Sequence, residues 1–479
     1  MKKFLLLLVP FYFSLFGFSQ STFVPDDNFE QVLIDLGLDT EPLDDYVPTA
    51  AIDTITALYI SNRDIIDMTG ISDFVNLRFL NCRINDMETL DLSGNILLEN
   101  LICSNNNLTT LDLSANVLLE TLDCGFNTIT ALDFSENINL LEVITTYNGL
   151  ETVNFSANTL IERIQVDRNN LENLDVSNNA ALKRLVCTTN FLEVIDISAN
   201  LNLETLGCSR NLITELDLSA NENLKNLNCS ANLISVLDVT ENLNLKGLSC
   251  SVNLLNDLNL SENGLLEGLA FAENSITSID LSNNPLLRSL QCGKNPLTVL
   301  DLSENDSLRS ISYYETNIIV MDVSHIAQLE ELLASSMPDL AQVNVANGNN
   351  DLMTLFYAAG CPNLTCITVD ADYVTIAEED WLIWNKDDSA VFSADCESLS
   401  VQELSNEITF YPSIFTNFIT IRSTYSTEFT VLNLAGQAVD IGSLHNGENR
   451  VDLSHLKSGI YLLNLNGEND EQMHKIVKK

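Results

Sequence analysis

A repeat of 21 residues, running without insertion from about residue 80 to about residue 320, constrains the fold of this chain more than any other feature. Each period has an eleven-residue half and a ten-residue half, and each half carries one column of asparagines. The first column is Asn85, Asn106, Asn127, Asn148, Asn169, Asn190, Asn211, Asn232, Asn253, Asn274 and Asn295. The second is Asn95, Asn116, Asn137, Asn158, Asn179, Asn200, Asn221, Asn242, Asn263, Asn284 and Asn305. A constant repeat length with apolar columns alongside predicts a solenoid, in which each turn buries its core only against its neighbours.

The asparagine columns have a structural explanation. At each corner the chain leaves a strand, and its backbone groups lose their ladder partners. A buried amide side chain has donors and an acceptor that satisfy them, whereas aspartate would bury a charge and leucine would leave orphan donors. The Leu-x-Leu and Leu-x-Cys segments between the corners alternate inward and outward, as short strands do.

The pattern Leu-x-x-Leu-x-Leu/Cys-x-x-Asn-x-Leu resembles the leucine-rich repeat. Its nested ten-plus-eleven form is similar to the bacterial subclass in which both halves of the repeat carry the motif. The resemblance covers about half of the chain. It implies a mainly β fold, a parallel β-solenoid with strands on both broad faces and few helices. It also implies recognition of a protein or ligand rather than catalysis.

The N-terminal end of the solenoid is expected to be closed by a short helical cap. The stretch "VPDDNFEQVLIDLG" has a helical period, with Asp26 or Asp27 near its start and Gly37 at its end. An atypical first repeat follows, with Arg63 in the asparagine slot. At the other end the pattern decays after Asn305, and Thr316 takes the asparagine slot.

Eight of the eleven cysteines fall on one column of the repeat: Cys82, Cys103, Cys124, Cys187, Cys208, Cys229, Cys250 and Cys292. Elsewhere this column holds residues such as Val166 and Phe271, which neither a metal site nor a disulfide would accept. We therefore predict packed free thiols, because free cysteine behaves as a small hydrophobe. Outside the repeat, Cys366 and Cys396 are the candidate disulfide of an exported chain, and the partner of Cys361 stays open.

One outward column is acidic: Asp91, Asp112, Asp133, Asp175, Asp196, Asp217, Asp238, Asp280, Asp301 and Asp322. Two interpretations are open. The carboxylates accept hydrogen bonds from neighbouring Ser and Thr residues, or carboxylates of adjacent turns, with Asp175, Asp196, Asp217 and Asp238 as candidates, share Ca²⁺. No other cofactor is expected.

Recognition is expected to use the outward column that varies most between turns, because packing does not fix it. Two places after the cysteine slot, this column contains Phe126, Tyr147, Arg168 and Arg210. Aromatic and arginine side chains are enriched at protein interfaces, so these four residues form the candidate contact cluster. The alternative is that they are surface residues that vary between turns without a binding role.

Charge and motif content narrow the function classes. The chain has 67 acidic and 22 basic side chains and a formal charge of −45, which disfavours nucleic acid and anionic membrane partners. The start, "MKKFLLLLVPFYFSLFGFSQ", has the pattern of a secretory signal peptide cleaved after Ser19. No later stretch is long and apolar enough to span a bilayer. The sequence contains no phosphate loop, His/Glu metal motif or nucleophile elbow, so no enzyme is predicted.

Residues 407–479 contain short alternating segments that predict a small antiparallel β-sandwich. This module resembles the C-terminal sorting domain of type IX secretion substrates of Bacteroidetes. The matching residues are Tyr411, Pro412, Gly436, Gly459, Tyr461 and Lys478. Ser413 and Ile414 depart from the Tyr-Pro-Asn-Pro motif that usually opens the family. The resemblance implies passage across the outer membrane through the type IX machinery, followed by release or surface attachment.

The sequence thus predicts a secreted or cell-surface binding protein, expected to be a monomer, that recognises an extracellular protein or acts in adhesion. The alternative is an extracellular polysaccharide-binding rod, assisted by Ca²⁺. The predicted organisation is a signal peptide (1–19), an N-terminal cap with the atypical first repeat (20–76), the solenoid (77–345), a C-terminal cap (346–398), a linker (399–406) and the sorting domain (407–479).

Overall fold

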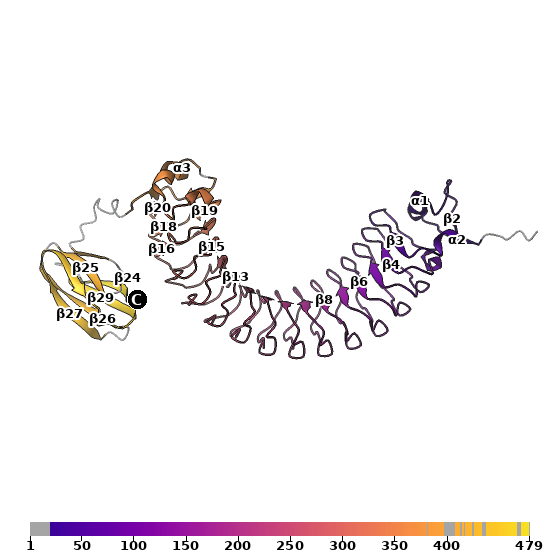
Figure 1. Ribbon diagram of the computed structural model, residues 1–479, viewed down its shortest axis with the longest axis horizontal. Coiled ribbons are helices and arrows are strands. Elements are labelled where there is room, and N and C mark those ends of the chain that lie inside the picture. The colour runs from indigo at the N-terminus through magenta and orange to yellow at the C-terminus, as the bar shows by residue number, and fades with distance from the viewer. Residues whose placement is uncertain are drawn as a thin grey trace, which may run out of the picture. The chain divides into compact units, whose positions relative to one another are not determined.

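The computed structural model describes residues 20–380, 382–396, 408–411, 414–415, 417–423, 426–433, 437–466 and 471–478. The expected signal peptide and linker lie outside these residues. The chain divides into two compact units, Met1–Ala394 and Asp395–Lys479. The first unit is a curved solenoid with one long parallel sheet on its concave side (Figure 1).

This long sheet has sixteen strands in parallel, one per turn. In chain order they are β3 (Ala57–Tyr59), β4 (Phe79–Asn81), β5 (Asn100–Ile102), β6 (Thr121–Asp123), β7 (Glu142–Ile144), β8 (Arg163–Gln165), β9 (Arg184–Val186), β10 (Thr205–Gly207), β11 (Asn226–Asn228), β12 (Gly247–Ser249), β13 (Gly268–Ala270), β14 (Ser289–Gln291), β15 (Ser310–Ser312), β17 (Glu331–Leu333), β19 (Leu355–Ala358) and β21 (Trp384–Lys386).

The constant period explains the register of this sheet. Leu101 of β5 pairs with Leu122 of β6, and Leu206 of β10 pairs with Leu227 of β11, each 21 residues apart. The central residue of each strand points inward, and the cysteine slot directly after the strand is also buried. The core is therefore a stack of similar layers along the solenoid, with residues such as Cys103, Val166 and Phe271 in equivalent positions.

Strands on both broad faces were expected, and for the regular repeats this expectation is wrong. Among the described residues of the first unit, the second face has strands only near the C-terminal end, in a four-stranded sheet of β16 (Val320–Asp322), β18 (Gln342–Asn344), β20 (Cys366–Thr368) and β22 (Val391–Ser393). In the regular turns, the described residues of the ten-residue half form turns instead. There the Oδ1 of Asp112 accepts the backbone N–H of Ser114, which would otherwise need a partner from a neighbouring turn.

The two asparagine columns are satisfied differently. In the first column, Asn190 accepts the N–H of Leu171 and donates to the carbonyls of Val166 and Cys187. In the second column, Asn200 donates to the carbonyls of Val176 and Asn179, while its buried Oδ1 has no partner. All eleven asparagines of the second column share this orphan oxygen. The expected use of both donor and acceptor therefore holds for the first column alone.

The N-terminal end is closed by β1 (Ser21–Phe23), α1 (Asp27–Asp35), β2 (Tyr46–Pro48) and α2 (Thr49–Ile52), followed by the short 3₁₀ helix η1 (Ile71–Asp73). The expected helix is confirmed as α1. Asp26 caps it by accepting the N–H groups of Asn28 and Phe29, and Gly37 follows it with φ +73°.

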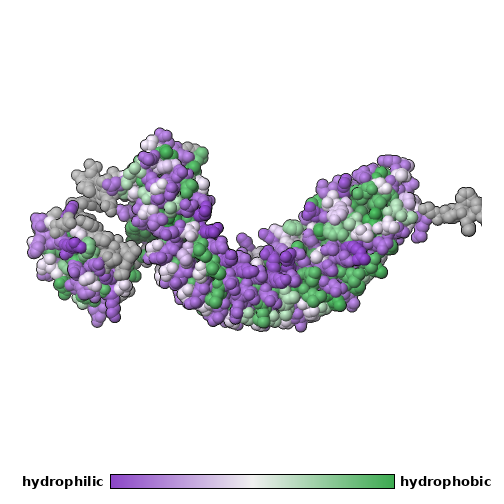
Figure 2. All heavy atoms as spheres, in the orientation of Figure 1, coloured by the Kyte–Doolittle hydropathy of each residue, from purple (hydrophilic) through white to green (hydrophobic). Residues whose placement is uncertain are grey.

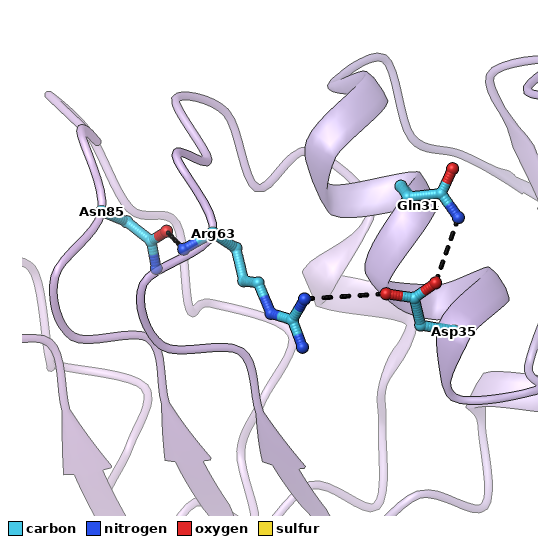
Figure 3. A network of polar contacts seen from close by, with 4 residues as sticks. All are labelled: Gln31, Asp35, Arg63 and Asn85. Atoms are coloured by element: carbon cyan, nitrogen blue, oxygen red, sulfur yellow. Dashed lines mark hydrogen bonds and ion pairs between the residues drawn. The ribbon is translucent and has the colours of Figure 1, made fainter.

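The cap is also tied to the first repeat. Arg63 occupies the expected asparagine slot, its guanidinium lies 3.6 Å from Asp35 of α1, and its backbone N–H donates to Asn85 (Figure 3). Gln31 donates to the other oxygen of Asp35.

The segment 346–398, expected to be a C-terminal cap, extends both sheets. It supplies β19 and β21 to the long sheet and β20 and β22 to the second sheet, together with η2 (Asn350–Leu352), η3 (Ala371–Tyr373) and α3 (Val374–Glu379). The 21-residue period is lost here, which is why sequence periodicity did not extend the solenoid past residue 345.

The second unit contains two sheets. One is antiparallel and consists of β23 (Ile408–Tyr411), β25 (Phe418–Ser423) and β28 (Gly447–Asp452). The other consists of β24 (Ile414–Phe415), β30 (Glu471–Lys478), β29 (Gly459–Asn466), β26 (Thr427–Leu432) and β27 (Ala438–Leu444), and is antiparallel except between β24 and β30. Buried residues of both sheets, including Ile419, Ile421, Val431 and Leu463, form a hydrophobic core separate from that of the solenoid.

Candidate recognition surface

The candidate contact cluster lies on a corner of the solenoid that has an unusual backbone. From Ile84 to Ser336, the residue two places after the cysteine slot has a positive φ of 51–58° in every turn, and none of these residues is glycine. This left-handed conformation costs roughly 1–2 kcal/mol for a residue with a Cβ. Glycine would avoid the cost, so each turn keeps a side chain at a position where the backbone disfavours one.

Three of the four candidate residues form one stack. The rings of Phe126 and Tyr147 lie 4.5 Å apart with an interplanar angle of 21°. The guanidinium carbon of Arg168 lies 4.4 Å from the centroid of the Tyr147 ring, a cation–π contact. Phe126 is 47% exposed and Tyr147 is 41% exposed, so the stack presents apolar surface to solvent.

Arg210, the fourth candidate, does not join this stack. Thr189 occupies the intervening turn, so Arg210 stands two turns beyond Arg168 on the same column. It is exposed, and the structure places it in the same left-handed conformation.

The concave face carries a feature that the sequence analysis missed. A groove of about 470 Å³ runs over β9 to β14, and Arg184 is the one charged residue among those that line it. Its floor consists of small and uncharged side chains, including Gly207, Asn228, Gly247 and Ser249. The sequence contains a signal for this groove: from Thr205 to Ser312, neither outward position of any long-sheet strand is charged.

The thiols of the inward cysteine column have low reactivity. All eight cysteines of the column are free and fully buried. Burial raises the pKa of Cys82, Cys187, Cys229 and Cys292 to about 12, so the reactive thiolate is scarce at neutral pH.

The three cysteines beyond the column divide into two kinds. Cys361 is free, and its Sγ donates to the carbonyl of Ala334 at 3.0 Å. Cys366 and Cys396 are both disulfide-bonded. Cys366 opens β20 and Cys396 follows β22, the strand paired with it.

The four candidate calcium ligands, Asp175, Asp196, Asp217 and Asp238, are engaged in local turns. Each accepts the backbone N–H of the residue two places on, at 2.9–3.0 Å. Hydrogen bonds from the hydroxyl and backbone N–H of Ser198 lower the pKa of Asp196, against smaller opposing effects of the neighbouring carboxylates. Among the described residues, the one group of three carboxylates close enough to share an ion is in the N-terminal cap, not on this column.

The sorting-motif residues lie in the second unit. Gly459 opens β29 with φ +154° and pairs with Lys478 of β30, which is 8% exposed. The Tyr461 hydroxyl donates to the carbonyl of Lys457. Tyr411 pairs with Thr420, while Pro412 and Gly436 lie outside the described residues.

Comparison with known proteins identifies the second unit. Residues 409–479 match the family described as the secretion system C-terminal sorting domain. A search of curated proteins finds no match to the sequence. In the part of the chain that the structure describes, no helix has the length and apolarity to cross a membrane.

Solved structures resemble the solenoid. The functional domain of InlJ from Listeria monocytogenes, which includes a cysteine ladder, aligns with a TM-score of 0.70 and 25% identity over 96% of this chain and 98% of that chain. The Leptospira interrogans leucine-rich repeat protein LIC12759 aligns with a TM-score of 0.62 and 19% identity, over 74% of this chain and 93% of that chain. An internalin, InlF, from Listeria monocytogenes aligns with a TM-score of 0.59 and 22% identity, over 64% of this chain and 94% of that chain.

Proposed function

Because this chain joins a leucine-rich repeat solenoid to a type IX C-terminal sorting domain, which indicates export to the cell surface or the medium, we propose that it is a binding protein for an extracellular protein partner. If the partner is a protein on the surface of another cell, the role of this chain is adhesion. The leucine-rich repeat solenoid is typically an interaction scaffold, and recognition is its activity here rather than catalysis.

The observation that carries this proposal is the stack of Phe126, Tyr147 and Arg168. Interfaces draw most of their binding energy from a few aromatic and arginine side chains. Stacking holds these three side chains in place before a partner arrives, so little conformational entropy is lost on binding. Every turn of this column shares the left-handed backbone, so the ring and guanidinium contacts distinguish these three positions from the rest of the column.

The test uses the chain from residue 20 as bait against surface proteins of host and neighbouring cells. Each captured protein is produced in pure form, and its Kd is measured. Replacing Phe126, Tyr147 and Arg168 with alanine is expected to weaken the complex at least tenfold, about 1.4 kcal/mol. The matched control replaces Glu273, Lys294 and Glu315, which lie on the same column in the same conformation.

Equal losses for the two triple variants would contradict the assignment of the cluster. Arg210→Ala is measured separately because Arg210 stands outside the stack. A smaller loss for this variant is expected, since no neighbouring ring holds its guanidinium in position.

The groove on the concave face, in which Arg184 is the one charged lining residue, favours a second candidate. Its amide and hydroxyl side chains, such as Asn226, Asn228 and Ser249, suit a neutral polyhydroxylated polymer. Binding to an array of extracellular polysaccharides, lost on Asn228→Leu but retained in the triple-alanine cluster variant, would support polysaccharide recognition instead.

A further inference from the structure

A second exposed surface lies on the side of the solenoid, on turns that follow the stack. The residue directly after the first-column asparagine is apolar in four consecutive turns: Phe191, Leu212, Leu233 and Leu254. These side chains are between 42% and 57% exposed. We name this row the side strip.

The fold does not require apolar residues in the side strip. The same column holds Asp86, Asn107, Thr128, Gly149 and Asn170 in the earlier turns, and Ser275, Pro296 and Asn317 in the later ones. A position that accepts these residues is not part of the core. Four adjacent apolar side chains at an exposed position therefore need an explanation outside the stability of the solenoid.

The backbone under the side strip is fixed from turn to turn. The N–H of Phe191 donates to the carbonyl of Leu171, and those of Leu212, Leu233 and Leu254 donate in the same way to the preceding turn, all at 2.9 Å. Most of the solenoid surface is hydrophilic (Figure 2). Exposed apolar residues also lie outside the side strip. Ile96 and Val117, for example, sit in local turns closed by bonds such as Leu98 N–H to Asn95. The side strip is thus a pre-ordered row.

Its spacing selects the kind of partner. The turn-to-turn hydrogen bonds under the side strip are like those between parallel strands, which lie about 4.8 Å apart, so the four side-strip residues span about 14 Å. An α-helix repeats one face about every 5.4 Å and spans about 16 Å over three turns. An extended strand repeats one face about every 6.6 Å and spans about 20 Å over three such repeats. A helix lying along the solenoid axis therefore matches the row, and an extended strand does not.

Exposed carboxylates beside the side strip predict basic residues along one edge of such a helix. Three residues beyond the side strip, the column alternates Val194, Glu215, Val236 and Asp257. Glu215 and Asp257 are exposed, and neither forms an ion pair with a described residue. They lie two turns, about 10 Å, apart, and two turns of a helix rise about 11 Å. A second copy of this chain is a poor occupant, because two chains of charge −45 repel each other.

We propose that the side strip docks an amphipathic helix of the protein partner, with one apolar residue per turn over four turns and basic residues two turns apart facing Glu215 and Asp257. This inference rests on the proposed function in that the partner is a protein. It assigns a surface separate from the Phe126–Tyr147–Arg168 stack.

The probe is a fluorescent synthetic peptide of about 15 residues, four helical turns, with a leucine in each turn and two lysines two turns apart on one edge. Its binding to the chain from residue 20 is measured by anisotropy. The double variant L212S/L233S is expected to weaken binding at least tenfold. The matched control, L201S/L243S, changes two leucines outside the side strip that are somewhat more exposed than Leu212 and Leu233, and it is expected to leave the Kd within about twofold.

Charge reversal tests the edge. E215K/D257K is expected to lose the lysine peptide and to bind the same peptide with glutamates in place of the lysines. Equal binding of a scrambled peptide, or equal losses in the two leucine double variants, would overturn the proposal.

Two further results would refute it by identifying another occupant. One is self-association, measured by sedimentation, that L212S/L233S abolishes. The other is binding to anionic lipid vesicles that the same variant abolishes. If no peptide binds while the stack variant still loses its captured partner, the side strip is refuted and the proposed function stands.

Discussion

The two asparagine columns look equivalent in sequence, yet the structure predicts that removing an asparagine of the first column destabilises the chain more than removing one of the second. Asn190 is 6% exposed and Asn200 is fully buried, so burial alone predicts that Asn200→Ala is the more damaging change. The hydrogen bonds predict the reverse order.

Asn190→Ala leaves the N–H of Leu171 without its acceptor. The carbonyls of Val166 and Cys187 each keep one donor, from Asn169 and Asn211 respectively. The cost is therefore one orphaned buried donor, about 1–3 kcal/mol, and two net hydrogen bonds of about 0.5–1.5 kcal/mol each. The total is about 2–6 kcal/mol, to which a small cavity is added.

Asn200→Ala loses two hydrogen bonds of similar strength. The carbonyls of Val176 and Asn179 keep their backbone donors, the N–H groups of Asn179 and Leu182. The substitution also removes an orphan oxygen whose burial already costs about 1–3 kcal/mol. The two effects nearly cancel, and the cavity is the same size as at residue 190. We expect a net cost of about 1 kcal/mol.

Urea unfolding followed by circular dichroism compares the two variants with Asn202→Ala, an exposed asparagine with one bond to the carbonyl of Ala180. This control is expected to stay within about 0.5 kcal/mol of the parent chain. Hydrogen exchange supplies a local readout, because only Asn190→Ala should accelerate exchange of the Leu171 amide. An Asn200→Ala loss equal to or larger than that of Asn190→Ala, or an unchanged Leu171 amide, would refute the reasoning.

Three further predictions concern the columns. The nine free thiols, all buried, should resist iodoacetamide in the native chain and react after unfolding; rapid native labelling of Cys187 would contradict its place in the core. The pKa of Asp175, Asp196 and Asp217 is lowered in the folded chain, so their stabilisation is present above about pH 4 and is lost as the pH falls through the lowered values. Asparagine can form the same turn, as Asn154 does by accepting the N–H of Ser156. Replacing all three aspartates with asparagine should therefore flatten the acid limb of a plot of Tm against pH. An unchanged acid limb would contradict a contribution of these carboxylates to the pH dependence. Finally, a chelator should leave Tm unchanged if the turns alone satisfy the aspartates, whereas a fall in Tm that added Ca²⁺ reverses would establish the calcium site.

Much of the molecule was readable from sequence because a fixed period places each residue beside its copies. The inward direction of Cys103 followed from Val166 and Phe271 in the same column, and the structure buries all three. The candidate contact column followed from its variability. Its left-handed backbone did not, because Phe126 and Tyr147 give no local signal for a conformation that usually selects glycine or asparagine.

The sequence by itself determined the period, the register, the inward and outward columns and the sorting module, since each depends on neighbours that the repeat fixes. Only the tertiary structure decided which half of the turn forms strands. Both halves have similar Leu-x-Leu patterns, but stacking into a curve brings successive turns closer on the concave side than on the convex side. On the concave side, successive turns are close enough to pair as parallel strands, as Leu101 pairs with Leu122. On the other side, a side chain such as Asp112 satisfies the backbone instead. The curvature belongs to the whole stack, so no single repeat encodes it.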